Sequence, residues 1–131
     1  MTGLITDLEQ ATLKNSDFRR VLYTGKHSQL VLMSLKPEED IGEETHTLDQ
    51  FFRFEKGTGK VIIDGVEHEI KDGSAVIVPA GAKHNVINTS ASEDLKLYTI
   101  YSPPEHQDGT VRTTKAEALT QEEHFDGKTS E

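Results

Sequence analysis

The chain has 131 residues, a length that corresponds to one domain, and it contains no cysteine, which excludes disulfides and thiolate metal sites. Lysine and arginine total 14 against 23 aspartates and glutamates, so the formal net charge is −9, and no basic run offers a site for nucleic acid or an anionic membrane. No apolar run approaches the ~18–20 residues of a membrane span, and Lys14, Asn15 and Asp17 argue against a secretory signal. We therefore expect a cytoplasmic protein that binds neither nucleic acid nor a membrane, and whose sites depend on histidines and carboxylates.

The first 17 residues are mixed in pattern, and we describe them as an N-terminal arm. Leu4, Leu8 and Ala11 can form one face of a short helix, whereas residues 12–17 are typical of a loop. From Phe18 the pattern changes to strand-length apolar segments at 18–24 and 28–36, followed by an acidic connection at 37–44. The next strand, 50–55, places Gln50, Phe52 and Phe54 on one face.

Turn signals then become regular. Segments 60–64 and 66–70 are joined at Asp64-Gly65, which favours a type I′ hairpin. Further turns at 72–73 and 79–81 separate strands at 75–78, 85–88 and 95–101. Short strands at this spacing predict an all-β sandwich or barrel over residues 18–102. Residues 103–131 are polar and mostly unpatterned, so we expect an extended C-terminal arm that ends in a disordered acidic tail from about Gln121.

The last strand bears on assembly. Lys96 indicates that its own face, with Tyr98 and Ile100, points outward. Outward apolar side chains on a barrel are more typical of an interface than of a site, so we expect a homodimer. Phe51, Arg53 and one of the two arginines at 19 and 20 can belong to that interface or to a solvated strand face.

Two of the six histidines have neighbours that suggest chemistry. Glu44, His46 and Gln50 share one face of an extended segment, and Phe52 continues that face into the core. Polar groups carried into an apolar interior need partners, because burying them unpaired costs several kcal/mol each. A divalent metal ion would satisfy all three, and a buried hydrogen-bond network is the alternative. His27, His68 and His124 are expected to be structural or solvated. His106, in the C-terminal arm, is ambiguous.

His84 supplies a second imidazole. The Pro79–Gly81 turn fixes the end of one strand and reverses the backbone, so that His84 begins the next strand at the same depth, sharing a face with Val86 and Asn88.

These residues resemble the two signatures of the cupin superfamily. The second, G-x5-P-x-G-x2-H-x3-N, matches at every position over residues 73–88, through Gly73, Pro79, Gly81, His84 and Asn88. The first, over residues 38–57, matches in part: His46, Gln50 and Gly57 fall on its second histidine, its glutamate and its closing glycine. Glu44 stands where the first histidine belongs and Glu38 where the opening glycine belongs. The resemblance covers roughly residues 28–101.

The resemblance implies a small single-domain cupin: a double-stranded β-helix, or jelly-roll barrel, with extended arms at both termini. Carried over by position, it implies one divalent metal ion, zinc, iron, manganese or nickel, held by Glu44, His46, Gln50 and His84. A neutral glutamine at the position of a glutamate implies a looser site. Type I phosphomannose isomerases are similar in pairing a glutamine and a glutamate with two histidines.

The same resemblance implies a pocket for a small organic ligand. We expect apolar walls, with the pocket residues Phe52, Phe54, Val86, Tyr101 and His106. The implied chemistry is oxygenation or isomerisation assisted by the metal, with Glu44 as the one candidate for a general base. The alternative is a non-catalytic ligand-binding or sensing barrel, and the sequence does not identify the substrate.

Overall fold

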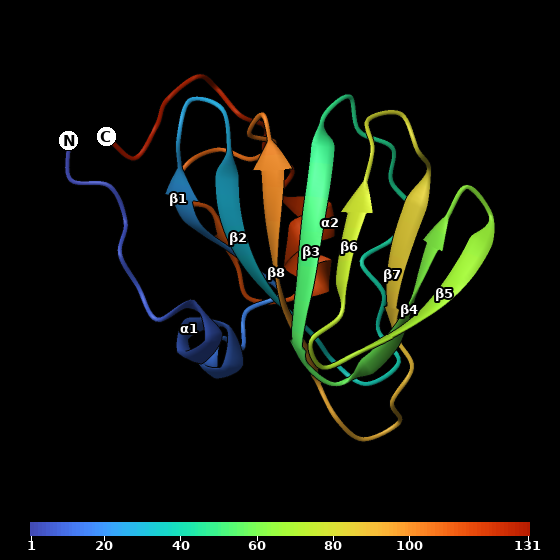
Figure 1. The fold of residues 1–131 in the computed structure, drawn as a ribbon. Coiled ribbons are helices and arrows are strands. Elements are labelled where there is room, and N and C mark those ends of the chain that lie inside the picture. Colours follow the sequence, from blue (N-terminus) through green and yellow to red (C-terminus); the bar gives the residue numbers. More distant parts are fainter.

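Two antiparallel β-sheets face each other in the computed structural model, which describes all residues from 1 to 131 (Figure 1). One sheet has six strands in the order β6-β3-β8-β2-β1-β9, and the other has three in the order β5-β4-β7. The strands are β1 (Arg19–Thr24), β2 (Gln29–Leu35), β3 (Asp49–Lys56), β4 (Thr58–Ile63), β5 (Val66–Lys71), β6 (Ala75–Val78), β7 (His84–Asn88), β8 (Leu95–Ser102) and β9 (Val111–Arg112). Two short helices, α1 (Leu8–Lys14) and α2 (Lys115–Thr120), complete the chain. The expected all-β jelly-roll architecture is confirmed.

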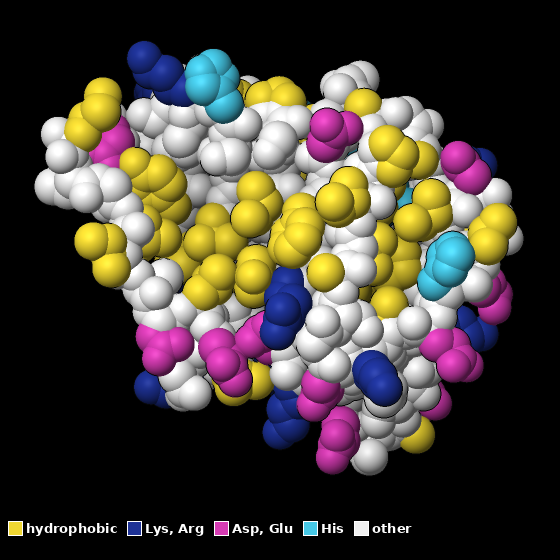
Figure 2. All heavy atoms as spheres, in the orientation of Figure 1, with side chains coloured by type: hydrophobic (Ala, Val, Ile, Leu, Met, Phe, Trp, Pro, Cys, Tyr) yellow, Lys and Arg dark blue, Asp and Glu magenta, His cyan; other side chains and the backbone are white.

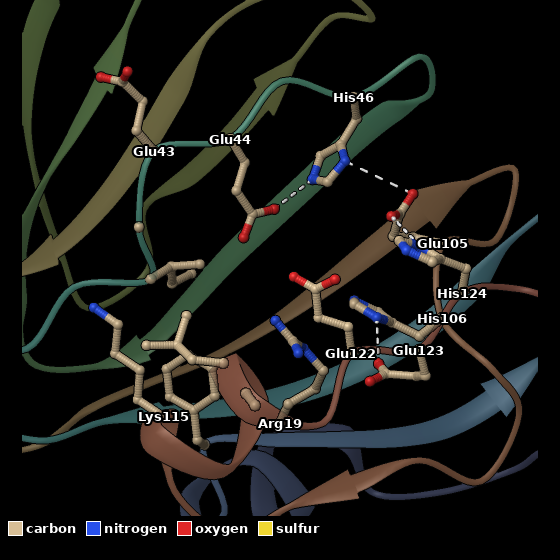
Figure 3. Close-up of a pocket in the computed structure, with 15 residues that line it drawn as sticks. Arg19, Glu43, Glu44, His46, Glu105, His106, Lys115, Glu122, Glu123 and His124 are labelled. Carbon is tan, nitrogen blue, oxygen red and sulfur yellow. Dashed lines mark hydrogen bonds and ion pairs between the residues drawn. The ribbon is translucent and has the colours of Figure 1, made fainter.

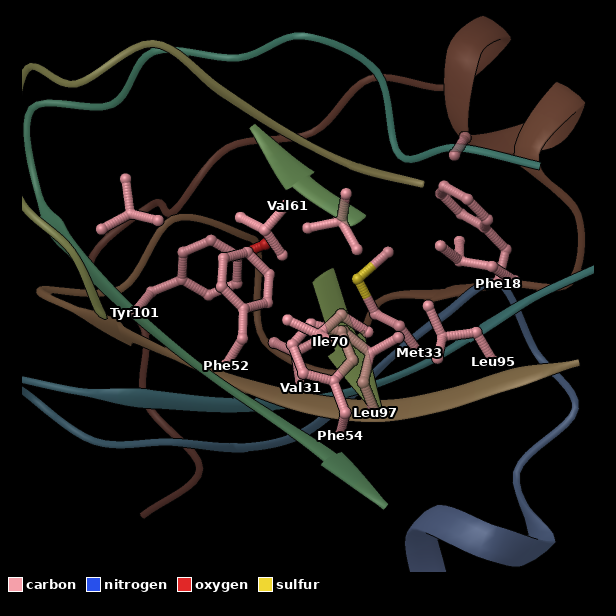
Figure 4. Close-up of a cluster of buried hydrophobic side chains, with 14 of the residues drawn as sticks. Phe18, Val31, Met33, Phe52, Phe54, Val61, Ile70, Leu95, Leu97 and Tyr101 are labelled. Carbon is pink, nitrogen blue, oxygen red and sulfur yellow. The ribbon is translucent and has the colours of Figure 1, made fainter. Parts of the chain in front are cut away.

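The core lies between the sheets and follows from the period-two alternation of the strands. On β3, Gln50, Phe52 and Phe54 point inward and are buried, as predicted, while Phe51 and Arg53 point outward. Figure 4 shows how the rings of Phe52 and Phe54 lie among aliphatic side chains from both sheets, and their centroids are 6.2 Å apart. The aliphatic members are fully or almost fully buried: Val31, Met33, Leu35, Val61, Ile70, Val86, Leu95 and Leu97.

The turns adopt the conformations that their residues favour. Asp64 and Gly65 both have positive φ, +47° and +82°, as the predicted type I′ turn between β4 and β5 requires. Gly81, at φ +89°, reverses the chain before β7. Glu38 has φ +65°, which is unusual for a residue with a side chain, and it occupies the position where the motif has glycine. The backbone geometry of that motif position is therefore kept although its residue is not.

The structure shows which residues of β8 point into the core and which point outward. Leu95, Leu97, Thr99 and Tyr101 are buried, whereas Lys96, Tyr98 and Ile100 point outward and are half-buried. Tyr98 and Ile100 continue onto Phe51 of β3, and apolar side chains gather on this outer face in Figure 2. Helix α1 packs on part of the same face and leaves other members, including Ile77 at 69% exposure, in solvent. The homodimer expected from this surface stays a prediction.

The termini differ from the sequence-based expectation. Helix α1 is capped by Asp7 and continues to Lys14, because Thr12 packs inward, so residues 12–14 are helical rather than loop. Residues 103–131 are not a plain extended arm: β9 adds to the edge of the six-stranded sheet beside β1, and α2 follows, capped by Thr114.

The tail beyond Gln121 is also ordered, and the expected disorder was wrong. Backbone hydrogen bonds tie Phe125 to Glu105 at 2.8 Å and Ser130 to Thr24 at 2.9 Å. The Glu131 carboxylate accepts a hydrogen bond from the Tyr23 hydroxyl at 2.6 Å. Contacts between residues so far apart in the chain produce no periodic pattern in the sequence, and the order of the tail could therefore not be predicted from it. Neither helix has the length and apolar character needed to cross a membrane.

Candidate metal centre

The segment before β3 forms a short antiparallel pair with β7 that brings the candidate ligands together. The Glu44 N–H donates to the His84 carbonyl at 2.9 Å, and the His84 N–H donates back to the Glu44 carbonyl at 2.9 Å. The Gly81 N–H donates to the His46 carbonyl at 2.8 Å, which extends the pairing through the turn. Residues directly opposite on paired strands have side chains on the same face, so Glu44 and His84 are neighbours by register.

The buried imidazole of His84 is oriented by a backbone carbonyl. Nδ1 lies 3.0 Å from the carbonyl oxygen of Ala82, which can only accept, so a proton on Nδ1 is hydrogen-bonded there and Nε2 is the nitrogen that can bind a metal ion. Nε2 lies 3.1 Å from Oε1 of Gln50, while Nε2 of Gln50 donates to the Thr99 hydroxyl at 3.0 Å. With Oε1 of Gln50 directed at Nε2 of His84, a cation between these two atoms would satisfy both in a buried site.

His46 presents a similar situation on the other side of the group. Its Nε2 lies 2.7 Å from Oε2 of Glu44, yet the approach is poorly directed for a hydrogen bond, so this buried nitrogen has no well-aligned partner. The distance is that of an ion pair. The opposite ring nitrogen, Nδ1, lies 3.7 Å from Glu105 (Figure 3).

The donor set fits a divalent metal ion. The ligating atoms of Glu44, His46 and His84 all lie within 4.8 Å of one another, and the amide oxygen of Gln50 adjoins His84. Ligands at about 2.1 Å from a metal lie up to about 4.2 Å apart, so a shift of a few tenths of an ångström per ligand closes the site. Two imidazoles, one carboxylate and one amide oxygen suit iron, manganese, nickel or zinc. All four residues predicted as ligands are therefore brought together.

Glu44 and His46 shift each other's protonation. Burial alone would raise the pKa of Glu44, but His46 outweighs it and holds that pKa below its usual 4.5. Burial alone would lower the pKa of His46, but the Glu44 carboxylate outweighs it and raises that pKa above 6.5. Without a metal, each group therefore favours the charged form of the other.

Metal affinity should consequently rise with pH above 6.5. His46 must release its proton before Nε2 can bind a metal ion, so the affinity should increase by up to about tenfold per pH unit until the raised pKa is passed. Glu44 remains ionised throughout this range, because its pKa is lowered. Competition titrations against a fluorescent chelator between pH 6 and 8.5 measure the profile. The exposed histidine variant His68→Ala should give the same profile, and a flat profile would contradict the assignment of His46.

A pocket of about 340 Å³ opens onto the Glu44–His46 side of this group. Its walls come from residues 41–46, from the start of β1 and from the C-terminal arm, and they are mainly polar. The expected apolar walls are therefore corrected for this pocket: Phe52, Phe54 and Val86 do not line it and are instead buried in the core cluster between the sheets. Of the expected pocket residues, only His106 lines this pocket.

Tyr101 lies just beneath the pocket and is buried. Its ring meets that of His46 edge-on, with the centroids 5.9 Å apart, and its hydroxyl lies 3.2 Å from Nε2 of His106. Nδ1 of His106 lies 2.8 Å from Glu123, which also pairs with Arg112 at 3.0 Å. Burial is the main reason that the pKa of Tyr101 is raised and that of His106 is lowered, so both groups are neutral near pH 7.

Most residues that line the pocket were missed as site residues from the sequence, and three of them bear on its chemistry: Arg19, Glu105 and Glu123. Arg19 was considered only for an interface, although its position two residues before Val21 places it on the inward face of β1. The alternation of inward and outward residues along β1 was therefore a signal in the sequence that could have identified Arg19. Glu105 and Glu123 lie in the C-terminal arm, where no periodicity indicates which side chains point inward.

The fold and this group of side chains define the class: a double-stranded β-helix barrel with a histidine- and carboxylate-rich centre. The sequence model of the family described as "Cupin domain" matches residues 31–101. The chain therefore belongs to the cupin family.

Individual proteins are also similar to this chain. "Uncharacterized protein YrkC" of Bacillus subtilis is 47% identical over 126 residues, which cover 91% of this chain and 67% of that protein. The crystal structure of BH2720 from Bacillus halodurans superimposes with a TM-score of 0.89 at 44% identity, covering 92% of this chain and 96% of that one. "Dimethylsulfoniopropionate lyase DddW" of Ruegeria pomeroyi is 37% identical over 51 residues, 39% of this chain and 34% of that protein.

Proposed function

We propose that the protein binds one divalent metal ion through Glu44, His46, Gln50 and His84 and acts as a metal-dependent enzyme on a small organic molecule in the adjoining pocket. The observation that carries this proposal is the convergence of Glu44, His46 and His84, whose ligating atoms all lie within 4.8 Å of one another beside the buried side chain of Gln50. Nε2 of His46 is buried without a well-aligned hydrogen-bond partner, and a metal ion would supply one.

An enzyme is favoured over a passive binding barrel by the pocket beside the centre. A bound metal ion would supply Lewis-acid chemistry or, if it is redox-active, a place to bind oxygen. The chain itself supplies ionisable groups at the same pocket: Glu44, His46, Glu105 and His106. His106 is held by Glu123 on one side and by Tyr101 on the other, an arrangement suited to holding or passing a proton. The local similarity to a protein named as a lyase also supports catalysis.

The alternative is a non-catalytic cupin that senses a metal ion or ligand. The replacement of a histidine by Glu44 and of a glutamate by Gln50, relative to the family motif, favours it. Both replacements keep an oxygen donor, and for that reason we place the enzyme first.

Metal analysis of untagged protein purified without chelator tests the proposal. Plasma mass spectrometry should find close to one metal ion per chain, restored after chelation by adding back iron, manganese, nickel or zinc. A redox-active native metal would support oxygen chemistry, and zinc would support isomerisation or elimination. A chain that carries no metal and takes none up would overturn the proposal and leave a ligand-binding barrel.

A further inference from the structure

Arg19 is a buried cation that has no hydrogen-bond or ion-pair partner for its guanidinium in the chain. It lies on the inward face of β1, opposite Met33 of β2, and is 9% exposed. Its Nε is buried without a hydrogen bond, and the guanidinium forms no ion pair with a carboxylate of the chain. Its guanidinium carbon lies 5.5 Å from the centroid of the Phe18 ring. A guanidinium offers five N–H donors, and here all of them are unused within the chain.

The other arginines are all paired, which makes this exception informative. Arg20 pairs with Asp17 at 2.8 Å, Arg53 with Glu55 at 2.7 Å and Arg112 with Glu123 at 3.0 Å. Lys115, the lysine of the pocket, is paired with Asp40. An unpaired charge that is nine-tenths buried is costly, and such a group is expected to meet a partner that is not part of the chain.

The guanidinium faces the same 340 Å³ pocket as the candidate metal ligands. In Figure 3 the side chain of Arg19 extends from β1 into the space that Glu44 and His46 approach from the other side. We propose that the pocket binds a small organic carboxylate, whose carboxylate group is held by Arg19 while the rest of the molecule reaches the metal centre. Arginine matches a planar carboxylate with two parallel hydrogen bonds, a geometry that lysine does not offer.

The charges around the pocket restrict the ligand further. Several carboxylates line it, among them Glu44, Glu105, Glu122 and Glu123, yet none lies within ion-pair distance of Arg19. Arg19 acts on two of them only at longer range, where its charge contributes to the lowered pKa of Glu44 and of Glu123. With so many carboxylates nearby, a monoanion is tolerated better than a dianion such as phosphate. The ligand class is therefore a small monocarboxylate with an uncharged remainder.

This inference concerns the ligand of the proposed metal centre, and its test separates the two. Pyruvate, lactate and propionate, each compared with its neutral amide, would be titrated calorimetrically into wild type, Arg19→Gln, Arg19→Lys and Arg20→Gln. Arg20→Gln is the matched control, because it removes the same charge from the next residue of β1, on the outer face. Each protein would be tested metal-loaded and chelator-treated, with its metal content and melting temperature measured on the same samples.

Wild type and Arg20→Gln should bind at least one carboxylate about tenfold or more tightly than its amide, and Arg19→Gln should lose this preference at unchanged metal content. Arg19→Lys should retain part of this preference, because lysine keeps the positive charge but cannot form the two parallel hydrogen bonds of a guanidinium. A preference that persists in Arg19→Gln, or that no carboxylate shows in wild type, would overturn the carboxylate site even if metal is bound. An Arg19-dependent preference in a chain that takes up no metal would instead support the carboxylate site and refute the metal centre.

Discussion

Replacing His84 with alanine should weaken divalent-metal binding by at least about a hundredfold while leaving the barrel folded. Among the candidate ligands, His84 is the most firmly positioned by the structure: its backbone pairs with Glu44, and its Nδ1 is held by the Ala82 carbonyl. Its removal leaves one imidazole and two oxygen donors, a set that binds iron, nickel or zinc weakly. Metal content after dialysis, together with competition titration, measures the loss.

His68→Ala is the control for this experiment, since His68 is exposed on β5 and belongs to no ligand group. It should retain the full metal content. Equal metal retention by the His84 and His68 variants would show that the metal is bound elsewhere, for example by surface carboxylates.

Gln50→Glu tests the fourth ligand in the same assay. If the side chain binds the metal through Oε1, adding a negative charge should strengthen binding. If Gln50 serves a hydrogen-bond network, with its amide turned so that it donates to His84, the carboxylate cannot donate. The variant should then lose thermal stability and gain no metal affinity. The direction of the change in affinity therefore distinguishes the two alternatives that the sequence left open.

The barrel and the convergence of the candidate metal ligands could be predicted because both follow from strand periodicity. The alternation that buries Phe52 and Phe54 also carries Gln50 inward, and the turn through Gly81 carries His84 to the same depth. These are local properties, which depend on residues two to five apart. The structure adds the backbone pairing of Glu44 with His84, which explains how a glutamate can replace the histidine of the motif at that position.

The pocket could not be predicted in the same way, because it is built by packing between distant parts of the chain. The C-terminal arm supplies Glu105 and His106, and its strand β9 pairs with β1 at the residue that is Arg19. No period or motif connects residue 19 with residues 105–124. Composition alone suggested a polar, disordered tail, whereas the tail covers one side of the candidate site.

Asn88, the last residue of the second motif, has a structural role that its position alone did not reveal. It is 1% exposed, and its Nδ2 lies 3.1, 3.0 and 2.8 Å from the carbonyl oxygens of Leu35, Lys36 and Glu93. Its Oδ1 accepts a hydrogen bond from the Ser90 N–H at 3.0 Å. One amide thus joins the end of β2, the loop after it and the loop after β7.

Asn88→Ala should lower the free energy of unfolding by about 2–4 kcal/mol, because it leaves buried carbonyls without donors and opens a small cavity. Asn88→Asp has nearly the same shape but should cost as much or more at pH 7, because a carboxylate cannot donate to the three carbonyl oxygens and repels them. Urea denaturation of wild type and both variants measures the effect. If the carboxylate variant is as stable as wild type, the three contacts contribute little and the motif asparagine is kept for another reason. Metal content should be unchanged in the folded fraction of each variant, because Asn88 forms no hydrogen bond with the candidate ligands. This result would separate the role of the motif in folding from its role at the metal centre.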